Sequence, residues 1–235
     1  MDSAKPIACG VDGCPSGWLC LSLDEDGKPI ARVFSVAEAL LRHADGAVTA
    51  IDIPIGLTSS DTRRCDVEAR LILGPRKSSV FPAPVRCTLS VASYDEACSA
   101  SFQACGKRLS KQTYGILPRI REVDTLLRQK PNLVANVFEV HPEVCFYFWN
   151  DGKPMRHPKQ SGFGFQERFR LVEQAFRGTA EVIRDSVSRR DASDDDILDA
   201  LAALWTARRI GSGTSVRLGN PPERDKYGLP MQMLA

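Results

Sequence analysis

The sequence predicts an α/β fold, built on a mixed five-stranded sheet with helices on both faces and a largely helical insertion. Three short apolar segments, at residues 7–11, 18–23 and 30–36, are separated by turn residues, which is typical of an antiparallel meander. A fourth segment, 47–53, is nearly all apolar, as a strand buried on both faces should be. The order meander, helix, strand, insertion, strand, helix, helix then favours a sheet that adds parallel strands to the meander, covered on both faces.

The remaining elements follow from helical spacing and from breakers. Helices are predicted at residues 37–43, 64–73, 94–105, 120–128, 166–176 and 194–209, and a fifth strand at 136–140. We expect residues 1–210 to form a single domain, with an insertion, 58–134, between strands four and five. Residues 211–235 are rich in Gly and Pro and are expected to form an arm or an edge segment.

The charge of the 235-residue chain is unevenly distributed. Its net charge of +2 excludes a strong overall field toward nucleic acid or anionic membranes. The insertion nevertheless holds 13 Lys/Arg against 7 Asp/Glu, so a basic insertion stands on an acidic body. Phosphate contacts are one interpretation of these side chains, and an ordinary solvated face is the other. The candidate phosphate-binding residues are Arg64, Arg70, Arg76, Ser78, Ser79, Lys111 and His141.

The eight cysteines favour a reduced, cytoplasmic protein. No Cys-x-x-Cys pair is present, which argues against a zinc site, and the first seven residues lack the apolar core of a signal peptide. No apolar run approaches the roughly 18 residues that cross a bilayer, so no membrane partner is expected. The oligomeric state stays open, with a dimer as one alternative.

Acidic residues at strand ends and on the last helix point to metal chemistry. The first and fourth predicted strands both end on an Asp, at Asp12 and Asp52. A carboxylate buried there loses its hydration and needs a bound cation or a hydrogen-bond donor to offset that cost. On the last helix, Asp196 and Asp199 lie on or beside a stripe of alanines that would pack on the sheet. Turn formation and the helix dipole are the structural alternatives. Converging carboxylates favour Mg²⁺ or Mn²⁺, up to two ions, which activate water for attack on phosphorus.

Two residues near the fifth strand extend this hypothesis. Glu139 ends that strand as Asp12 and Asp52 end theirs, so it is a candidate catalytic residue and extra ligand, with capping or ion pairing as the equal alternative. His141 is a candidate general acid or phosphate contact, although a histidine bonded to the backbone before Pro142 is the more ordinary situation.

At this point the chain resembles known families. Asp12, Asp52 and the run Asp196-Ile-Leu-Asp199-Ala-Leu are similar to the acidic residues of the RNase H-like fold, especially the RuvC type of Holliday-junction resolvase. The chain more closely resembles domain of unknown function family 429, described as predicted nucleases of that fold. The motifs that carry this resemblance are Gly10-Val-Asp-Gly-Cys-Pro-Ser-Gly-Trp18, Asp52-Ile-Pro-Ile-Gly-Leu57, Arg64-Cys-Asp-Val-Glu-Ala-Arg70, Ser78-Ser-Val-Phe-Pro-Ala-Pro84, Glu139-Val-His-Pro-Glu143 and Asp195-Asp-Ile-Leu-Asp-Ala-Leu201.

The resemblance implies a metal-dependent nuclease that hydrolyses phosphodiester bonds of nucleic acid, with Asp12, Asp52, Asp196 and Asp199 as ligands of Mg²⁺ or Mn²⁺. RuvC-type enzymes usually carry Glu where this chain has Asp52. Two alternatives stay open. One is a module that binds nucleic acid or a phosphorylated ligand without turnover. The other is a phosphotransferase of the sugar kinase and actin type, although a second glycine-rich phosphate loop is absent.

Overall fold

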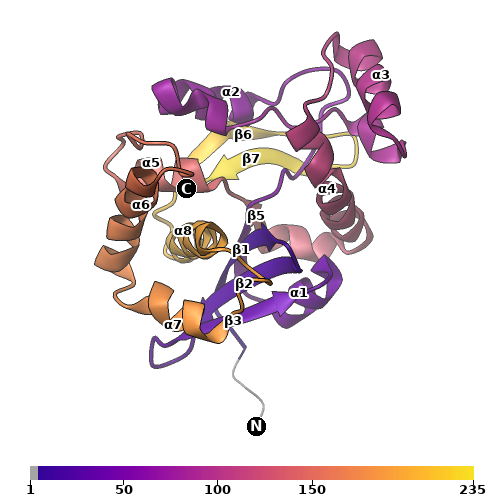
Figure 1. The fold of residues 1–235 in the computed structure, drawn as a ribbon. Coiled ribbons are helices and arrows are strands. Elements are labelled where there is room, and N and C mark those ends of the chain that lie inside the picture. The colour runs from indigo at the N-terminus through magenta and orange to yellow at the C-terminus, as the bar shows by residue number, and fades with distance from the viewer. Residues whose placement is uncertain (1–4) are drawn as a thin grey trace.

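A computed structural model describes residues 5–235 and confirms the α/β class with a mixed five-stranded sheet. The strands lie in the order β3-β2-β1-β4-β5 (Figure 1). β1 pairs with β2, and β2 with β3, in antiparallel fashion, whereas β4 is parallel to β1 and β5 is parallel to β4. The strand bounds are β1 Ala8–Cys14, β2 Gly17–Leu23, β3 Pro29–Phe34, β4 Val48–Ile51 and β5 Val137–Glu139.

Helices cover both faces of this sheet, as predicted. One face packs mainly against α8, with three more helices beyond it (Figure 1). The opposite face buries Cys9, Val11 and Ile51 against α1 and α4. The helices are α1 Ala37–His43, α2 Arg64–Leu73, α3 Tyr94–Cys105, α4 Lys111–Gln129, α5 Pro142–Trp149, α6 Gly162–Ala175, α7 Thr179–Ser186 and α8 Asp194–Gly211.

α8 lies unusually close to the central strand, and Gly10 permits it. A Cβ atom on Gly10 would stand 2.1 Å from the backbone nitrogen of Leu204 and 2.2 Å from the carbonyl oxygen of Ala200. The alanines at 200, 203 and 207 are fully buried on the same side of the helix. Small side chains on both partners therefore bring the helix backbone onto β1, as the alanine stripe predicts.

The insertion between β4 and β5 contains α2, α3 and α4, together with short 3-10 turns at Gly74–Ser79, Arg86–Ser90 and Pro131–Ala135. The bounds of α1, α2 and α3 agree with the predicted ones. α4 begins nine residues earlier than the predicted 120, because Ser110 caps it by accepting a hydrogen bond from the Thr113 amide and Pro118 is accommodated within it. α5 and α7 were not predicted from the sequence.

Residues beyond α8 form a second, two-stranded sheet instead of extending the edge of the main one. β6, Arg217–Arg224, and β7, Pro230–Leu234, pair in antiparallel fashion. Leu218, Met233 and Ala235 are buried against α2, on which this hairpin packs. The C-terminal segment is thus part of the folded core.

Two structural facts concern the cysteines and the expectation of no membrane partner. All eight cysteines are free thiols, and six of them are buried. None of the helices in residues 5–235 combines the length and the apolar character that a membrane crossing requires.

Candidate active site

Asp12 lies in β1 on the face that α8 covers. The sequence places it at the end of the strand, but β1 continues to Cys14, and Asp12 stands opposite Leu19 of β2. Side chains alternate along a strand, so Gly10 and Asp12 share one face while Cys9 and Val11 belong to the other. The Asp12 side chain is 7% exposed.

The parallel pairing of β1 and β4 brings Asp52 beside Asp12. Val11 is in register with Ile51, and the Asp52 amide donates a hydrogen bond of 3.0 Å to the Val11 carbonyl. The next residue of each strand is the aspartate, so both carboxylates emerge on the α8 face. Asp52 is half-buried.

The first turns of α8 contribute the remaining acidic residues. Asp199 is buried, 5% exposed, and directly precedes Ala200, which contacts β1 together with Leu204. Asp196 belongs to a capping box: its carboxylate accepts a 2.7 Å hydrogen bond from the Ser193 amide, and its own amide donates to the Ser193 hydroxyl. The helix start therefore accounts for Asp196, which favours the structural alternative for this residue.

Lys159 places a positive charge among these carboxylates. Its ammonium lies 2.7 Å from Oδ2 of Asp199, and its side chain is 40% exposed. It also lowers the pKa values of Asp12, Asp52 and Asp195. Residue 159 lies in the loop between α5 and α6, a position to which no sequence pattern drew attention.

Burial and mutual repulsion make the cluster electrostatically strained. Burial, and then the charges of Asp199, Asp52 and Asp196, raise the pKa of Asp12 well above its usual value. Burial raises the pKa of Asp52 to about 6, although His141 and Lys159 lower this pKa. Carboxylates of this kind favour a cation or a proton at neutral pH.

Asp12 and Asp52 have no hydrogen-bonding partner in the protein for their carboxylates. Within residues 5–235, no hydrogen-bond donor reaches either carboxylate, whereas Asp199 has Lys159. Water still reaches the oxygens of both carboxylates, because neither is among the fully buried side-chain atoms of residues 5–235 that lack a hydrogen-bond partner. A cation bound there would replace this water as the partner of the two carboxylates. The oxygen donors fit Mg²⁺ or Mn²⁺, and Asp12 and Asp52 are the residues that would hold such an ion. No three His, Cys, Asp or Glu side chains in that part of the chain converge on one ion position.

Glu139 does not join the cluster, because the register of β5 against β4 places it one residue short of Asp52. In the parallel pairing, Glu139 is in register with Ile51, not with Asp52, so it faces the opposite side of the sheet. There its two oxygens accept hydrogen bonds of 2.6 and 2.7 Å from Arg63, and Oε2 also accepts one from the Ile55 amide. Arg63 pairs with Asp66 as well. This geometry favours the ion-pairing alternative for Glu139.

The predicted phosphate-binding residues are dispersed, and several have structural partners. Arg64 bonds the carbonyl of Pro221, and Arg70 bonds the carbonyls of Lys77 and Val80. Lys111 is exposed at the start of α4, and Ser78 is exposed in the turn after α2. None of these four contacts the carboxylate cluster through an observed hydrogen bond.

Arg76, Ser79 and His141 form one network, in which His141 lowers the pKa of Asp52. Arg76 contacts both Glu143, at 3.3 Å, and the Ser79 hydroxyl, at 3.4 Å. The His141 Nδ1 accepts a hydrogen bond from the Glu143 amide, which leaves its Nε2 to donate to the Ser79 carbonyl at 3.2 Å. His141 thus caps α5 through its side chain, as the backbone-bonded alternative expects.

Two further residues were missed by sequence reasoning. Asp195 is half-buried beside Lys159, and burial raises its pKa. Its position four residues before Asp199 on the same helical face was an available signal. Arg119 of α4 donates to the Cys14 carbonyl and lies where a side chain on Gly13 would be, 3.2 Å away. Only the tertiary structure reveals that contact.

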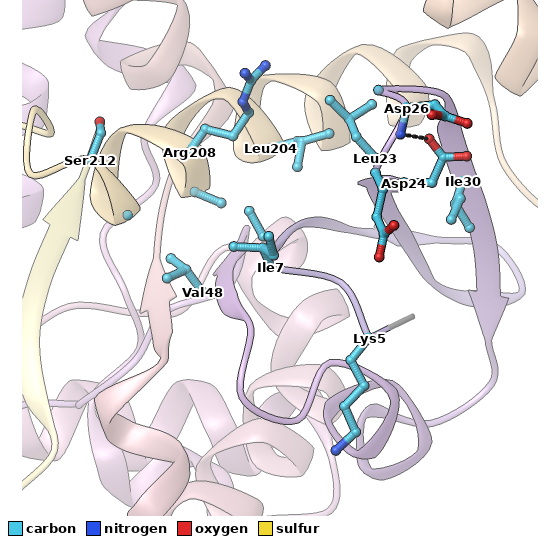
Figure 2. Close-up of a pocket in the computed structure, with 15 residues that line it drawn as sticks. Lys5, Ile7, Leu23, Asp24, Asp26, Ile30, Val48, Leu204, Arg208 and Ser212 are labelled. Carbon is cyan, nitrogen blue, oxygen red and sulfur yellow. Dashed lines mark hydrogen bonds between the residues drawn. The ribbon is translucent and has the colours of Figure 1, made fainter. Parts of the chain in front are cut away.

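A hollow of about 920 Å³ lies at the other end of α8 (Figure 2). Ile7, Val48 and Leu204 form its apolar floor, Asp24 and Asp26 stand at one rim and Arg208 at another. It shares no residue with the carboxylate cluster. The cluster therefore stays the candidate site on chemical grounds.

Comparison with known proteins places the chain in a family. The family model described as "Protein of unknown function (DUF429)" matches residues 10–224, nearly the whole chain, and the protein belongs to this family. Neither the comparison with curated proteins nor that with solved structures finds a match.

Proposed function

We propose that this protein is a metal-dependent nuclease of the RNase H-like class, acting in the cytoplasm on phosphodiester bonds of nucleic acid. One observation carries the proposal. Asp12 is a buried carboxylate without a protein donor, held beside Asp52 and close to Asp199 at the point where α8 meets the sheet. The strand pairing and the Gly10 contact maintain that arrangement.

Each residue has a distinct part in the proposed mechanism. Asp12 and Asp52 would hold Mg²⁺ or Mn²⁺, which would supply Lewis acidity for the attack of water on phosphorus. Asp199 orients the Lys159 ammonium, which stands ready to pair with a phosphate oxygen of the substrate. Arg76 and Ser79, which His141 connects to the surroundings of Asp52, are the candidates to position the neighbouring phosphates. Because the Arg76 guanidinium also pairs with Glu143, it keeps its orientation without substrate.

Replacing Asp12 tests this proposal. Asp12→Asn keeps the volume of the side chain but removes the charge that would bind the ion. We expect Mn²⁺-dependent cleavage of linear and branched DNA and RNA to fall by about a hundredfold or more, with unchanged circular dichroism. The matched control is Asp26→Asn, an exposed residue of the β2–β3 turn, which should cleave like the wild type. If the wild-type protein cleaves none of these substrates with either ion, the nuclease proposal is wrong, and tight binding without product favours a binding module.

A further inference from the structure

The ammonium of Lys159 occupies a place in the carboxylate cluster that a cation would take. It lies 2.7 Å from Asp199, and its own pKa shows that the surroundings favour its charge. Burial lowers that pKa, but Asp199, Asp12 and Asp52 together raise it above its usual value. The ammonium therefore contacts Asp199 directly, and its charge also favours the ionised forms of Asp12 and Asp52.

The loop that carries Lys159 is held firmly against α6. The Glu167 carboxylate accepts hydrogen bonds of 2.9 to 3.1 Å from the amides of Arg156 and His157. At Gly164 the backbone of α6 comes so close to Pro158 that a Cβ atom there would stand 1.9 Å from the Pro158 carbonyl oxygen. The backbone that carries Lys159 is consequently fixed by these contacts with α6.

Charge balance then limits how many ions the site can take. Asp12, Asp52 and Asp199 carry three negative charges when ionised, and Lys159 returns one positive charge. Asp196 has its own partner in the Ser193 amide, and Asp195, in the same first turn of α8, faces the positive end of the helix dipole, so neither is counted among the ligands of the ion. The remaining two negative charges correspond to one divalent cation. Mg²⁺ commonly binds one or two carboxylates and completes its shell with water and substrate phosphate.

We infer that Lys159 is the resident second cation of this site, so that the protein binds one divalent ion, at Asp12 and Asp52, where two-ion nucleases bind two. The inference rests on the proposed function for its chemistry. Lys159 then has a positioning role. Its ammonium pairs with Asp199, so that Asp199 does not bind the divalent ion, and its positive charge repels a second ion. The two cations then share the charge of the phosphate in the same way that two metal ions would.

Mn²⁺ titration tests the inference without any cleavage assay. Isothermal calorimetry, with free Mn²⁺ followed by electron paramagnetic resonance, gives the number of ions per chain. We expect one ion for the wild type and for Lys159→Arg, which keeps the charge. Lys159→Met keeps the apolar stem and removes the charge, so it should bind a second ion or bind the first about tenfold more tightly or better. Lys153→Met, an exposed lysine of the same loop, should behave like the wild type.

Each outcome decides the inference. One ion in the wild type and two ions, or tighter binding, in Lys159→Met supports it, provided that thermal unfolding shows both chains folded. Two ions in the wild type, no ion at all, or identical titrations of the wild type and Lys159→Met overturn it. If Lys159→Met does not fold, Lys159→Gln takes its place. Cleavage assays on the wild type judge the nuclease proposal separately, because a two-ion enzyme would still cleave.

Discussion

At the scale of single residues, Asp52 carries a charge that folding disfavours. Burial raises its pKa from 3.8 to about 6, so the folded state binds the proton more tightly than the unfolded chain. The stability that this residue contributes is therefore fully present below pH of about 4 and is lost as the pH rises through about 6. The ionised Asp52 carboxylate therefore destabilises the fold at neutral pH while no cation is bound to it.

We therefore predict that Asp52→Asn stabilises the metal-free protein at pH 7.5. The gain is at most about 3 kcal/mol in the free energy of unfolding, and less to the extent that water reaches the half-buried carboxylate. Urea unfolding in EDTA at pH 4, 5, 6 and 7.5 measures it, and the advantage should shrink toward zero at pH 4. Asp26→Asn is the control for a general charge effect. An equal or lower stability of Asp52→Asn at pH 7.5 would contradict the strain assigned to this carboxylate.

At the scale of elements, the contact between β1 and α8 determines whether the site assembles. Gly10 faces backbone atoms of Ala200 and Leu204, which cannot move aside as a flexible side chain would. Asp12 lies two residues further along β1, and Asp199 is the residue before Ala200. Any separation of the helix from the strand at Gly10 therefore also separates the two aspartates.

Gly10→Ala is predicted to destabilise the fold by more than about 3 kcal/mol, because the added methyl group meets backbone on two sides. Denaturant unfolding measures this loss, and Mn²⁺ binding should weaken in any chain that still folds. The matched control is Gly115→Ala in α4, where nothing lies within 4 Å of the new methyl group. Removing a helix glycine there should stabilise the protein by about 1 kcal/mol. Similar effects at both positions would show that close packing of α8 on β1 is not required.

Elements with strong local patterns could be predicted from the sequence, and those governed by distant contacts could not. The bounds of α1, α2 and α3 followed from apolar spacing and from breakers such as Gly74. α5 was missed because its run of large apolar residues after Pro142 lacks helical periodicity. The start of α4 was missed because Pro118 is usually a helix breaker, whereas the exposed position tolerates it here.

The same distinction holds for the candidate site. Asp12, Asp52 and Asp199 could be selected because strand ends and a helix face are visible in the pattern. The exclusion of Glu139 depends on the register of β4 and β5, and one residue of phase decides which face a side chain takes. Lys159 has no local signal at all, because only the clamped loop before α6 brings it to Asp199.

At the scale of the whole molecule, the C-terminal hairpin ties the insertion to the rest of the chain. Asp225 is buried between β6 and β7 and accepts hydrogen bonds from the amides of Leu57 and Leu229, and it also pairs with Arg86 of the insertion. Arg86 pairs in turn with Asp124 of α4. One carboxylate thus connects the end of the chain, the segment after β4 and the longest helix of the insertion.

We predict that the chain cannot lose this hairpin and stay folded. Ending it at residue 214 removes the buried side chains of five large apolar residues, each contributing about 1.5–3 kcal/mol, against a typical net stability of about 5–15 kcal/mol. Those residues are Leu218, Leu229, Met231, Met233 and Leu234. The shortened chain should show no cooperative urea transition. In the full chain, Asp225→Ala should cost about 3 kcal/mol, because Arg86 keeps Asp124, whereas Glu223→Ala, an exposed neighbour, should cost almost nothing. An unchanged unfolding midpoint in the shortened chain would show that the hairpin is a removable arm.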